Sequence, residues 1–592
     1  MTVKTGFERA ALWRVALTLT VLAPVPAMAQ VNARPPTREE LSPRAIAGEP
    51  VAPGGRLTVV GNVERAPCPL ADPRYANVSV NFADVRLEGL RVVDAATLRD
   101  SWSDLAGHDV PIASLCEVRD RIATALRDMG YLAAVQVPPQ RIDKGGTVRL
   151  DVFMAKLVAI EVRGDAGNSE KLIAAHMEAL KDQPVFNVHE AERHLLLARD
   201  LPGYDVRLAL RPAGTAPGEV VGEVTVVRRR VEADINVQNM GSHAVGPVGG
   251  LARVRINDIT GMGDSTVLSV FSTAQPREQT VVQAGHSMAL GSNGLRLSGD
   301  FTYAWSKPDV VGGQLSSDTM IATGALSFPL ARRQVRTLFA TGGLDVIDQD
   351  LRFGSGASRV PLSRDRLRVL FARLEGDLVD PASIVSTSGY SAYEPRWHLG
   401  GALEVRQGLS GLGASGGRSL IPMSRQDGDA SAFVIRASAQ AEYRPTPDFT
   451  IAIAPRAQYS PDVLLSYEQI SAGNYTVGRG YDPGTLSGDS GVGLSTELRY
   501  GRIMPRGAGS FAFQPFVFLD TAWVWHQSAT FVGLDPQKLA SAGGGVRATW
   551  AGRARLDLTL ATPLRTAGFQ TERGATRLLF SISTQILPWR HQ

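Results

Sequence analysis

Residues 231–592 repeat one pattern, in which segments of about ten residues alternate between apolar and polar side chains. Residues 295–305 show it clearly, with one apolar and one polar set: Leu295, Leu297, Phe301, Tyr303 and Trp305 against Arg296, Ser298, Asp300 and Thr302. Successive side chains of a strand point to opposite faces, so the pattern predicts strands with an apolar and a polar face. A soluble β-sandwich would also alternate. The strand length and the aromatic strand ends (Tyr303, Trp305, Trp523, Trp525) favour a barrel with a lipid-facing exterior and a polar lumen.

The N-terminus predicts export from the cytoplasm. Lys4, Arg9 and Arg14 precede a short apolar run that ends in the small-x-small sequence Ala27-Met28-Ala29. This arrangement is typical of a secretory signal peptide, here residues 1–29 with cleavage before Gln30. No later run of 18 or more apolar residues predicts a membrane-spanning helix. We therefore expect a bacterial outer-membrane protein.

The charges and the cysteines limit the partners further. The 62 Lys and Arg and 58 Asp and Glu residues are mixed throughout, for a net charge of +4, and no basic run predicts nucleic-acid binding. Cys68 and Cys116 are the only two cysteines. In an oxidising compartment they predict one disulfide, which would contribute about 4 kcal/mol in the chain-entropy model. The alternative is two buried thiols.

The alternation in residues 231–592 predicts sixteen antiparallel strands, an even number as is usual for such barrels. The expected strands are 231–241, 248–258, 264–274, 278–290, 295–306, 319–330, 334–347, 364–376, 395–407, 431–443, 448–460, 489–502, 511–525, 541–550, 554–562 and 576–586. Short connections such as 291–294 are expected in the periplasm. The long connections 307–318, 408–430 and 461–488 are expected to be extracellular or folded inward.

Two small α/β domains are predicted before the barrel, at residues 76–155 and 156–230. In each, a strand is followed by two helices and two further strands, and such repetition indicates tandem copies of one unit. The predicted fold class is therefore a membrane β-barrel of about sixteen antiparallel strands preceded by two periplasmic α/β domains. Residues 30–75 are rich in proline and glycine and predict a flexible segment. Within them, Thr37 and Glu40 match a capping box, which would also fit a short plug helix.

One histidine motif resembles a metal site without fitting it. His189 and His194 are five residues apart, which separates them by about 140° around a helix, whereas the zinc-protease motif needs a spacing of four. Asn187 and Glu190 instead match a helix cap. No metal or other cofactor is expected.

The long connection 461–488 carries the most specific candidate residues, Gly478-Arg479-Gly480-Tyr481. The two glycines allow a tight backbone turn around the arginine. Asp520 lies on a later strand, and Phe518 shares its side, which should face the lumen. If the loop folds inward, Arg479 and Asp520 can form a buried fork-shaped ion pair.

These residues carry a resemblance to a known family. The run MGYLAAVQVPPQRIDKGGTVRLDVFMAKLVAIEVRGD (129–165) resembles a POTRA domain boundary, and GRGY with the later FLDTA resembles two signature motifs of outer-membrane transporters. Further matches are VQNMGSHAVG (237–246), NDITGMGD (257–264) and LSGDSG (486–491). With two POTRA-like repeats and sixteen strands, the chain resembles the two-partner secretion (TpsB) transporters, the haemolysin secretion/activation family. Gly478 stands where that family commonly has valine.

The resemblance implies passive export in the type V, two-partner mode. A partner exoprotein, such as an adhesin or a haemolysin-like protein, would dock on the periplasmic domains by strand addition through an N-terminal secretion domain. It would then thread outward through the barrel, which would act as a monomer in outer-membrane lipid. In the family, the contact between the loop arginine and the aspartate holds the loop inside, and Arg479 and Asp520 inherit these roles.

Two other transporter classes remain as alternatives, a general outer-membrane assembly factor and a diffusion porin. An enzyme is not expected. The fragments Gly488-Asp489-Ser490-Gly491 and Gly413-Ala414-Ser415-Gly416-Gly417 match serine-hydrolase motifs only formally, without the required strand–turn–helix setting or a His/Asp partner.

Overall fold

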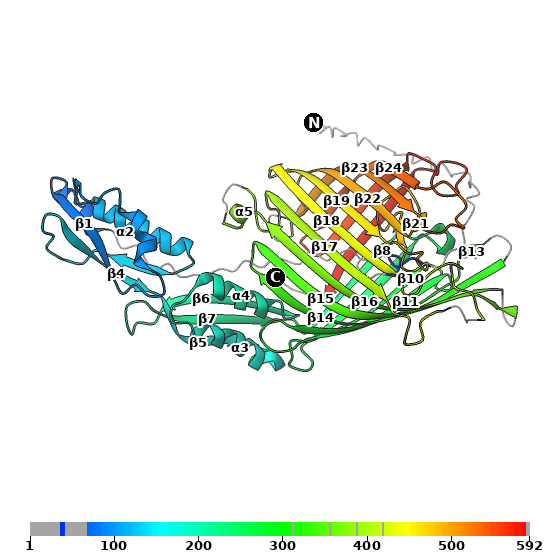
Figure 1. Cartoon of the computed structure of the whole chain (residues 1–592), viewed down its shortest axis with the longest axis horizontal. Coiled ribbons are helices and arrows are strands. Elements are labelled where there is room, and N and C mark those ends of the chain that lie inside the picture. Colours follow the sequence, from blue (N-terminus) through cyan, green and yellow to red (C-terminus); the bar gives the residue numbers. More distant parts are fainter. Residues whose placement is uncertain are drawn as a thin grey trace, which may run out of the picture.

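The computed structural model describes residues 36–41, 68–310, 313–354, 358–385, 389–416, 420–505, 507 and 509–587. Two small α/β domains precede a large barrel, and the whole chain is elongated (Figure 1). The predicted signal peptide, residues 1–29, lies outside the described residues. None of the described helices has the length and apolarity needed to cross a bilayer.

The first domain forms a four-stranded sheet in the order β2-β1-β4-β3. Its elements are β1 (Ser79–Glu88), the 3-10 helix η3 (Ala95–Ser101), β2 (Asp109–Pro111), α2 (Ser114–Asp128), β3 (Ala133–Gln136) and β4 (Gly146–Met154), after two 3-10 turns at Pro69–Ala71 and Pro73–Tyr75. The apolar face of α2 is buried against this sheet. The first of the two helical segments is the 3-10 helix η3. Trp102, the residue after it, is buried, and its indole nitrogen donates to Asp84 at 2.9 Å.

The second domain repeats the unit with a three-stranded sheet in the order β5-β7-β6. Its elements are β5 (Lys156–Gly164), η4 (Gly167–Ser169), α3 (Glu170–Lys181), α4 (Val188–Arg199), β6 (Tyr204–Pro212) and β7 (Glu219–Arg228). The two domains are joined by backbone hydrogen bonds from Phe186 to Ala155 (2.7 Å) and from Val188 to Gly130 (2.8 Å). A Cβ at position 130 would lie 2.5 Å from the ring of His189, so this close approach requires glycine.

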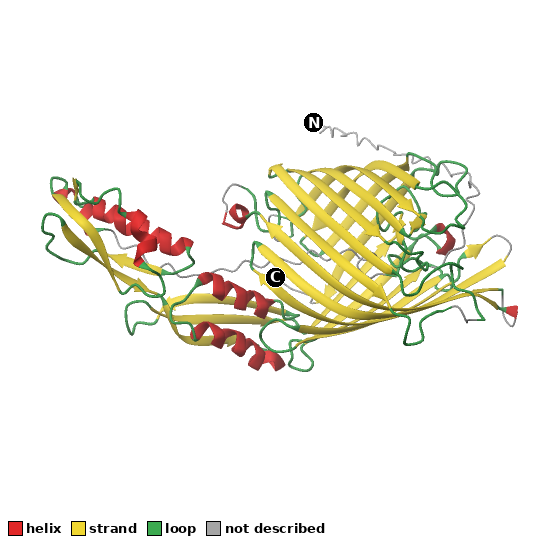
Figure 2. Cartoon of the chain, viewed as in Figure 1, coloured by secondary structure: helices red, strands yellow, loops and turns green. Residues whose placement is uncertain are grey.

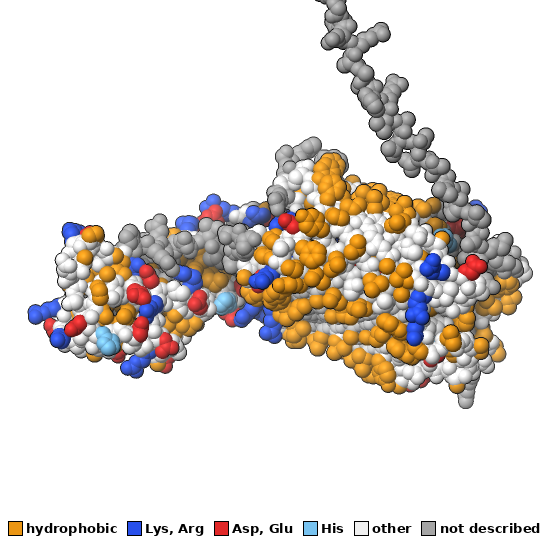
Figure 3. Space-filling view, turned by 90° about the horizontal axis from the view of Figure 1, so that it is seen from above, with side chains coloured by type: hydrophobic (Ala, Val, Ile, Leu, Met, Phe, Trp, Pro, Cys, Tyr) orange, Lys and Arg blue, Asp and Glu red, His pale blue; other side chains and the backbone are white. Residues whose placement is uncertain are grey.

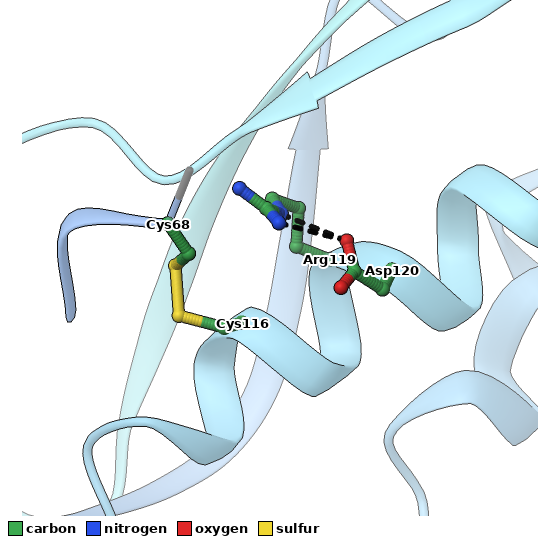
Figure 4. The surroundings of a disulfide bond; sticks show 4 residues. All are labelled: Cys68, Cys116, Arg119 and Asp120. Carbon is green, nitrogen blue, oxygen red and sulfur yellow. Dashed lines mark hydrogen bonds and ion pairs between the residues drawn. A yellow bond between two sulfur atoms is a disulfide. The ribbon is translucent and has the colours of Figure 1, made fainter. Parts of the chain in front are cut away.

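Cys68 and Cys116 form a disulfide, with their Cα atoms 5.9 Å apart (Figure 4). The bond ties the segment before β1 to the first turn of α2, one turn ahead of the adjacent Arg119–Asp120 ion pair. The sequence predicted this disulfide, with two buried thiols as the alternative, and the structure has the disulfide.

The barrel closes when the last strand pairs with the first. Among the described residues it has sixteen long strands and the two-residue β13 (Figure 2). They are β8 (Val231–Gln238), β9 (Gly249–Asn257), β10 (Ser265–Thr273), β11 (Gln279–Ala289), β12 (Arg296–Ser306), β13 (Asp309–Val310), β14 (Gly313–Arg332), β15 (Arg336–Phe353), β16 (Val360–Val379), β17 (Trp397–Gly408), β18 (Phe433–Thr446), β19 (Phe449–Tyr459), β22 (Ser490–Tyr500), β23 (Phe511–Trp525), β24 (Gln537–Trp550), β25 (Ala554–Pro563) and β26 (Arg577–Leu587). A five-residue helix, α5 (Pro381–Val385), follows β16.

The predicted connection 307–318 is wrong in part, because β14 already begins at residue 313. β14, β15 and β16 run for 20, 18 and 20 residues, longer than predicted. They extend beyond the other strands at the end of the barrel away from the two small domains (Figure 1). Cross-strand ion pairs continue along this extension, including Arg364 with Asp350. The extended ends of β14–β16 carry many polar residues, so they lack the alternation of apolar and polar side chains from which the strand ends were predicted.

The exterior of the barrel is largely apolar, while the small domains show mixed charges (Figure 3). Adjacent residues of β23 show the alternation directly: Val517 and Leu519 are 56% and 46% exposed, whereas Phe518 and Asp520 are 5% and 1% exposed. The sequence therefore assigned the two faces of this strand correctly.

The second domain is fixed to the turns at the near end of the barrel. Arg332 at the end of β14 donates two hydrogen bonds of 2.6 Å to Asp200 after α4. Asp258, fully buried after β9, accepts from the Ser169 hydroxyl at 2.5 Å and from Arg228 at 3.0 Å. These contacts hold the second domain against the turns at this end of the barrel.

Candidate functional site

The connection between β19 and β22 folds back into the barrel lumen. Within it, β20 (Ile470–Ala472) and β21 (Leu486–Gly488) form a small hairpin. The apolar side chains of this loop pack on lumen-facing residues of the wall, in one buried cluster: Ile470, Ala472, Val477, Tyr481 and Leu486 with Ala522, Val524, Leu539 and Ala567. The loop is therefore a packed part of the barrel interior.

The two glycines flanking Arg479 are needed for different reasons. Gly478 has a φ of 121°, a backbone conformation that L side chains rarely adopt. Gly480 lies so close to the wall that a Cβ would be 2.8 Å from the backbone nitrogen of Pro563. A side chain at position 480 would clash with the wall backbone, and one at position 478 would strain the backbone of the turn.

Arg479 and Asp520 meet as the sequence suggested. The Nη2 and Nε atoms of Arg479 donate to the two carboxylate oxygens of Asp520 at 2.7 and 2.9 Å. The backbone N–H of Arg479 donates to the same carboxylate at 3.0 Å. Asp520 is only 1% exposed, so the loop supplies both the charge and the hydrogen bonds that this buried carboxylate needs.

Three further groups complete the arginine site. Arg479 Nη1 lies 2.5 Å from Glu497 Oε1, and its Nη2 donates to the Ser495 hydroxyl at 2.9 Å. The guanidinium stacks 3.6 Å above the centroid of the Phe518 ring, a cation–π contact. Sequence reasoning named Phe518 but missed Glu497 and Ser495. Their signal was the alternation in β22, which puts both residues on the lumen side.

Glu497 links the loop site to the rest of the wall. It accepts two hydrogen bonds from Arg547 on β24, at 2.8 and 2.9 Å, and one from Arg499 at 2.7 Å. Arg547 in turn stacks 4.2 Å from the centroid of the Phe516 ring. Neighbouring lumen-facing residues of three strands are thus coupled by charge, so a change at one site is felt by the others.

Tyr481 fixes the other side of the turn. It is 2% exposed, and its hydroxyl lies 2.8 Å from the carbonyl oxygens of Ala540 and Arg565. It can donate to one of them at a time. The four residues Gly478–Tyr481 therefore contact the wall from β22 to the connection after β25.

Residues 36–41 also lie inside the lumen. They belong to the segment 30–75, which the sequence predicted to be flexible. Leu41 is 2% exposed and belongs to a cluster of lumen-facing apolar residues that includes Phe271 and Leu367. The expected capping pair forms, since the Thr37 backbone N–H donates to Glu40 at 2.8 Å. The residues adopt one turn.

Glu39 holds this N-terminal turn to both the wall and the loop. It accepts from Arg456 on β19 at 3.0 Å and from the Ser471 hydroxyl of β20 at 2.9 Å. The Leu41 carbonyl accepts from Gln283 on β11 at 3.0 Å. These partners are far away in the sequence, so no local pattern could predict the contacts.

The residues singled out as formal catalytic or metal motifs do not assemble into such sites. His194 lies across from His176 of α3, with ring centroids 6.4 Å apart, instead of joining His189. No three metal-ligating side chains come together among the described residues. The Ser490 hydroxyl makes its hydrogen bonds with the backbone of Ser460, and the Ser415 hydroxyl accepts from the backbone of Arg366.

Comparison with sequence families gives two matches. Residues 383–548 match the family described as haemolysin secretion/activation protein ShlB/FhaC/HecB, and residues 80–154 match the POTRA domain of the ShlB type. The first match contains both Arg479 and Asp520. A curated relative, the heme/hemopexin transporter protein HuxB of Haemophilus influenzae, is 26% identical over 176 residues, which is 28% of this chain and 30% of that protein. The chain thus aligns with less than a third of this relative.

Solved structures share the fold over nearly the whole chain. CdiB from Escherichia coli has a TM-score of 0.65 at 17% identity, and CdiB from Acinetobacter baumannii has 0.60 at 17%. Each comparison covers 90% of this chain and 94% of the other. BamA from Haemophilus ducreyi, lacking POTRA domains 1–3, has a TM-score of 0.50 at 14% identity and covers 86% of this chain and all of that one. At such identities the likeness concerns the fold alone.

Proposed function

We propose that this chain, a two-partner secretion (TpsB) transporter of the bacterial outer membrane, binds a partner exoprotein in the periplasm and exports it through its barrel. The single observation that carries the proposal is the loop of residues 461–488, which is held inside the lumen by Arg479 and Asp520. The second of two α/β domains is joined to the same barrel at its periplasmic end, and the first is joined to the second.

The export route follows from this arrangement. An unfolded segment has unpaired backbone groups that can add to a sheet edge of the periplasmic domains. The polar, charged lumen wall can then solvate the passing chain. The loop and the N-terminal turn occupy the lumen, so both must yield space during transport. The step uses no nucleotide, and folding outside the cell would make it directional.

Two alternatives make different demands on the chain. A general assembly factor inserts other barrels into the membrane, and the fold likeness to BamA is compatible with that role. However, the family matches at 80–154 and 383–548 favour secretion. A diffusion porin would have no use for the two periplasmic domains.

We further propose that the transporter acts as a monomer in outer-membrane lipid and has no catalytic activity. The partner would be a secreted protein with an N-terminal secretion domain, of the adhesin or haemolysin class. HuxB is named for heme and hemopexin, but only 30% of its length is aligned here. The partner's identity therefore has to come from experiment.

A secretome comparison tests the proposal. The chain is deleted in its native cell and restored as the parent, as Arg479→Ala, or as Arg141→Ala, whose side chain is 92% exposed. Mass spectrometry then quantifies extracellular and outer-membrane proteins. We expect the deletion to remove one large exoprotein, and we expect the parent and Arg141→Ala, but not Arg479→Ala, to restore it.

Two outcomes would overturn this function. Loss of many barrel proteins from the outer membrane on deletion would identify an assembly factor. An unchanged secretome together with altered uptake of small solutes would identify a porin.

A further inference from the structure

Among the described residues, the seam where the barrel closes has the shortest pairing between two long strands of the wall. β26 and β8 share six register pairs, with an irregularity between Gln585 and Leu587. The flanking pairings, β25 with β26 and β8 with β9, have eight each.

Side chains extend the closure where the backbone ladder stops. Asn239, just after β8, donates from its amide nitrogen to the Leu578 carbonyl at 2.8 Å. Its amide oxygen accepts from the Phe580 backbone N–H at 2.7 Å. The Asn239 amide thus imitates one more residue of the ladder at the extracellular end of the seam.

The tip of the lumen loop contacts both sides of this seam. Asp482 directly follows the Gly478–Tyr481 turn. Its carboxylate lies 2.8 Å from Nδ1 of His243, in the connection after β8, and 2.9 Å from Nη1 of Arg577, the first residue of β26. The Asp482 carboxylate therefore bridges the connection after the first barrel strand, β8, and the beginning of the last barrel strand, β26.

Two neighbouring loop residues add contacts on the side of the first strand. The Asn474 side chain donates to the Met240 carbonyl at 2.9 Å, and the Tyr475 hydroxyl accepts from Gln238 at 3.0 Å. On the other side, the Arg577 side chain is 12% exposed, and Asp482 is the acid within ion-pair distance of it among the described residues. Loss of the carboxylate would therefore leave a largely buried cation without its acidic partner.

We propose that Asp482 is a positioning residue that clasps the barrel seam while the loop is anchored inside the lumen. The Arg479–Asp520 pair holds the base of the turn, and Asp482 uses that anchored position to hold the extracellular ends of β8 and β26 together. Movement of the loop during transport then releases the seam at its extracellular end. The link to transport rests on the proposed function, but the clasp itself does not.

Hydrogen–deuterium exchange of the purified full-length chain in lipid nanodiscs tests the clasp. We expect Asp482→Asn, which keeps the shape but removes the charge, to speed exchange of residues 577–581 and 237–240 at least about fivefold. Exchange of β22 and β23 should stay as in the parent. Asp427→Asn is the matched control, because Asp427 accepts from Ser528 between other extracellular connections.

A cross-link separates the clasp from a general effect of the substitution. Val237 and Ile582 are directly opposed across the seam and are 43% and 46% exposed on the lipid side. With cysteines at both positions, oxidation should return exchange in Asp482→Asn to the parent rate, and reduction should reverse the rescue.

Exchange at the seam that is unchanged by Asp482→Asn would overturn the clasp. Equal acceleration in β22 and β23 would also overturn it, because it would show loss of the loop as a whole. Neither readout depends on secretion, so failure of the proposed function would leave this test intact.

Discussion

Arg479 fits its site through the planar shape of the guanidinium as much as through its charge. Two parallel hydrogen bonds to Asp520, one contact with Glu497 and the face of Phe518 use all sides of the group. A lysine could supply the charge but not this set of contacts. The site therefore selects arginine specifically.

A double-mutant cycle on this pair should show strong coupling. We expect Arg479→Gln to lower the free energy of unfolding by about 3–5 kcal/mol, because it leaves the buried carboxylate of Asp520 without a cation. Asp520→Asn should cost less, because Arg479 keeps Glu497 as an ionic partner. The double variant should lose less than the sum, with a coupling energy of about 1–3 kcal/mol. Urea unfolding in detergent micelles measures this, and strictly additive losses would show that the two residues do not act as a pair.

His176 predicts that the second periplasmic domain weakens in acid. Burial, with a smaller contribution from His194, lowers the pKa of His176 to about 4, against 6.5 for an ordinary histidine. Between these values the unfolded chain binds a proton that the folded domain does not. Stability therefore falls as the pH drops from 6.5 toward 4, by up to about 3 kcal/mol.

Hydrogen exchange of α3, corrected for the intrinsic pH dependence, checks this expectation. The parent should lose protection between pH 7 and pH 4.5, and His176→Leu should lose much less. His108→Leu, at an exposed position of the first domain, is the control. A loss of protection in His176→Leu as large as in the parent would contradict the assignment.

Two separate sequence patterns pointed to the ion pair between Arg479 and Asp520. The alternation placed Asp520 and Phe518 on the lumen side, and the paired glycines marked Arg479 as the residue of a tight turn. Glu497 escaped notice because any lumen-facing acid on sixteen strands was an equal candidate. The role of Glu497 depends on its ion pairs with Arg547 and Arg499, which the structure places next to it.

At the scale of elements, strand boundaries were predictable where one face meets lipid and the other a polar lumen. The prediction failed in the extension of β14–β16, where charged groups such as Asp318 and Arg352, which pair with each other on one face, interrupt the apolar alternation. It also failed for residues 36–41, whose position depends on distant partners. The alternation of neighbouring residues contains neither the end of such a strand extension nor the position of a segment that is held by distant partners.

The N-terminal turn should act as a removable obstruction. Glu39→Gln removes the charge that pairs with Arg456 and weakens the contact with Ser471. We expect the turn to leave the lumen more often, so the single-channel conductance in planar bilayers should rise relative to the parent. Glu117→Gln, at an exposed pair on α2, should not change it. Equal conductance of Glu39→Gln and the parent would show that the turn does not limit the pore.

The disulfide should stabilise the first periplasmic domain on its own. Replacing Cys68 and Cys116 by serine removes a cross-link over 48 residues, which corresponds to about 4 kcal/mol in the chain-entropy model. We expect faster hydrogen exchange in α2 and β1 but not in α3 or α4. Reduction of the parent should reproduce the effect, and uniform acceleration across both domains would argue against a local role.

For the molecule as a whole, hydrogen bonds join the two small domains and the barrel into one continuous structure. The two small domains are hydrogen-bonded to each other, and the second is fixed to the barrel through Arg332 and Asp258. The parts that occupy the lumen are held by ion pairs that can form and break. Transport is therefore expected to move the loop and the N-terminal turn against a stationary wall.

Site-specific photo-crosslinking during secretion tests passage through the lumen most directly. Ser298 and Leu297 are adjacent on β12 and face opposite sides. Leu297 is 36% exposed on the lipid side, while Ser298 shares its side with Thr302, which accepts a hydrogen bond from the lumen residue Gln283. A photoreactive phenylalanine analogue is introduced at each position in cells that secrete the partner. Cross-links to the exoprotein from position 298 and not from 297 are predicted. Cross-links from 297 alone, or none from 298 while secretion continues, would contradict export through the barrel.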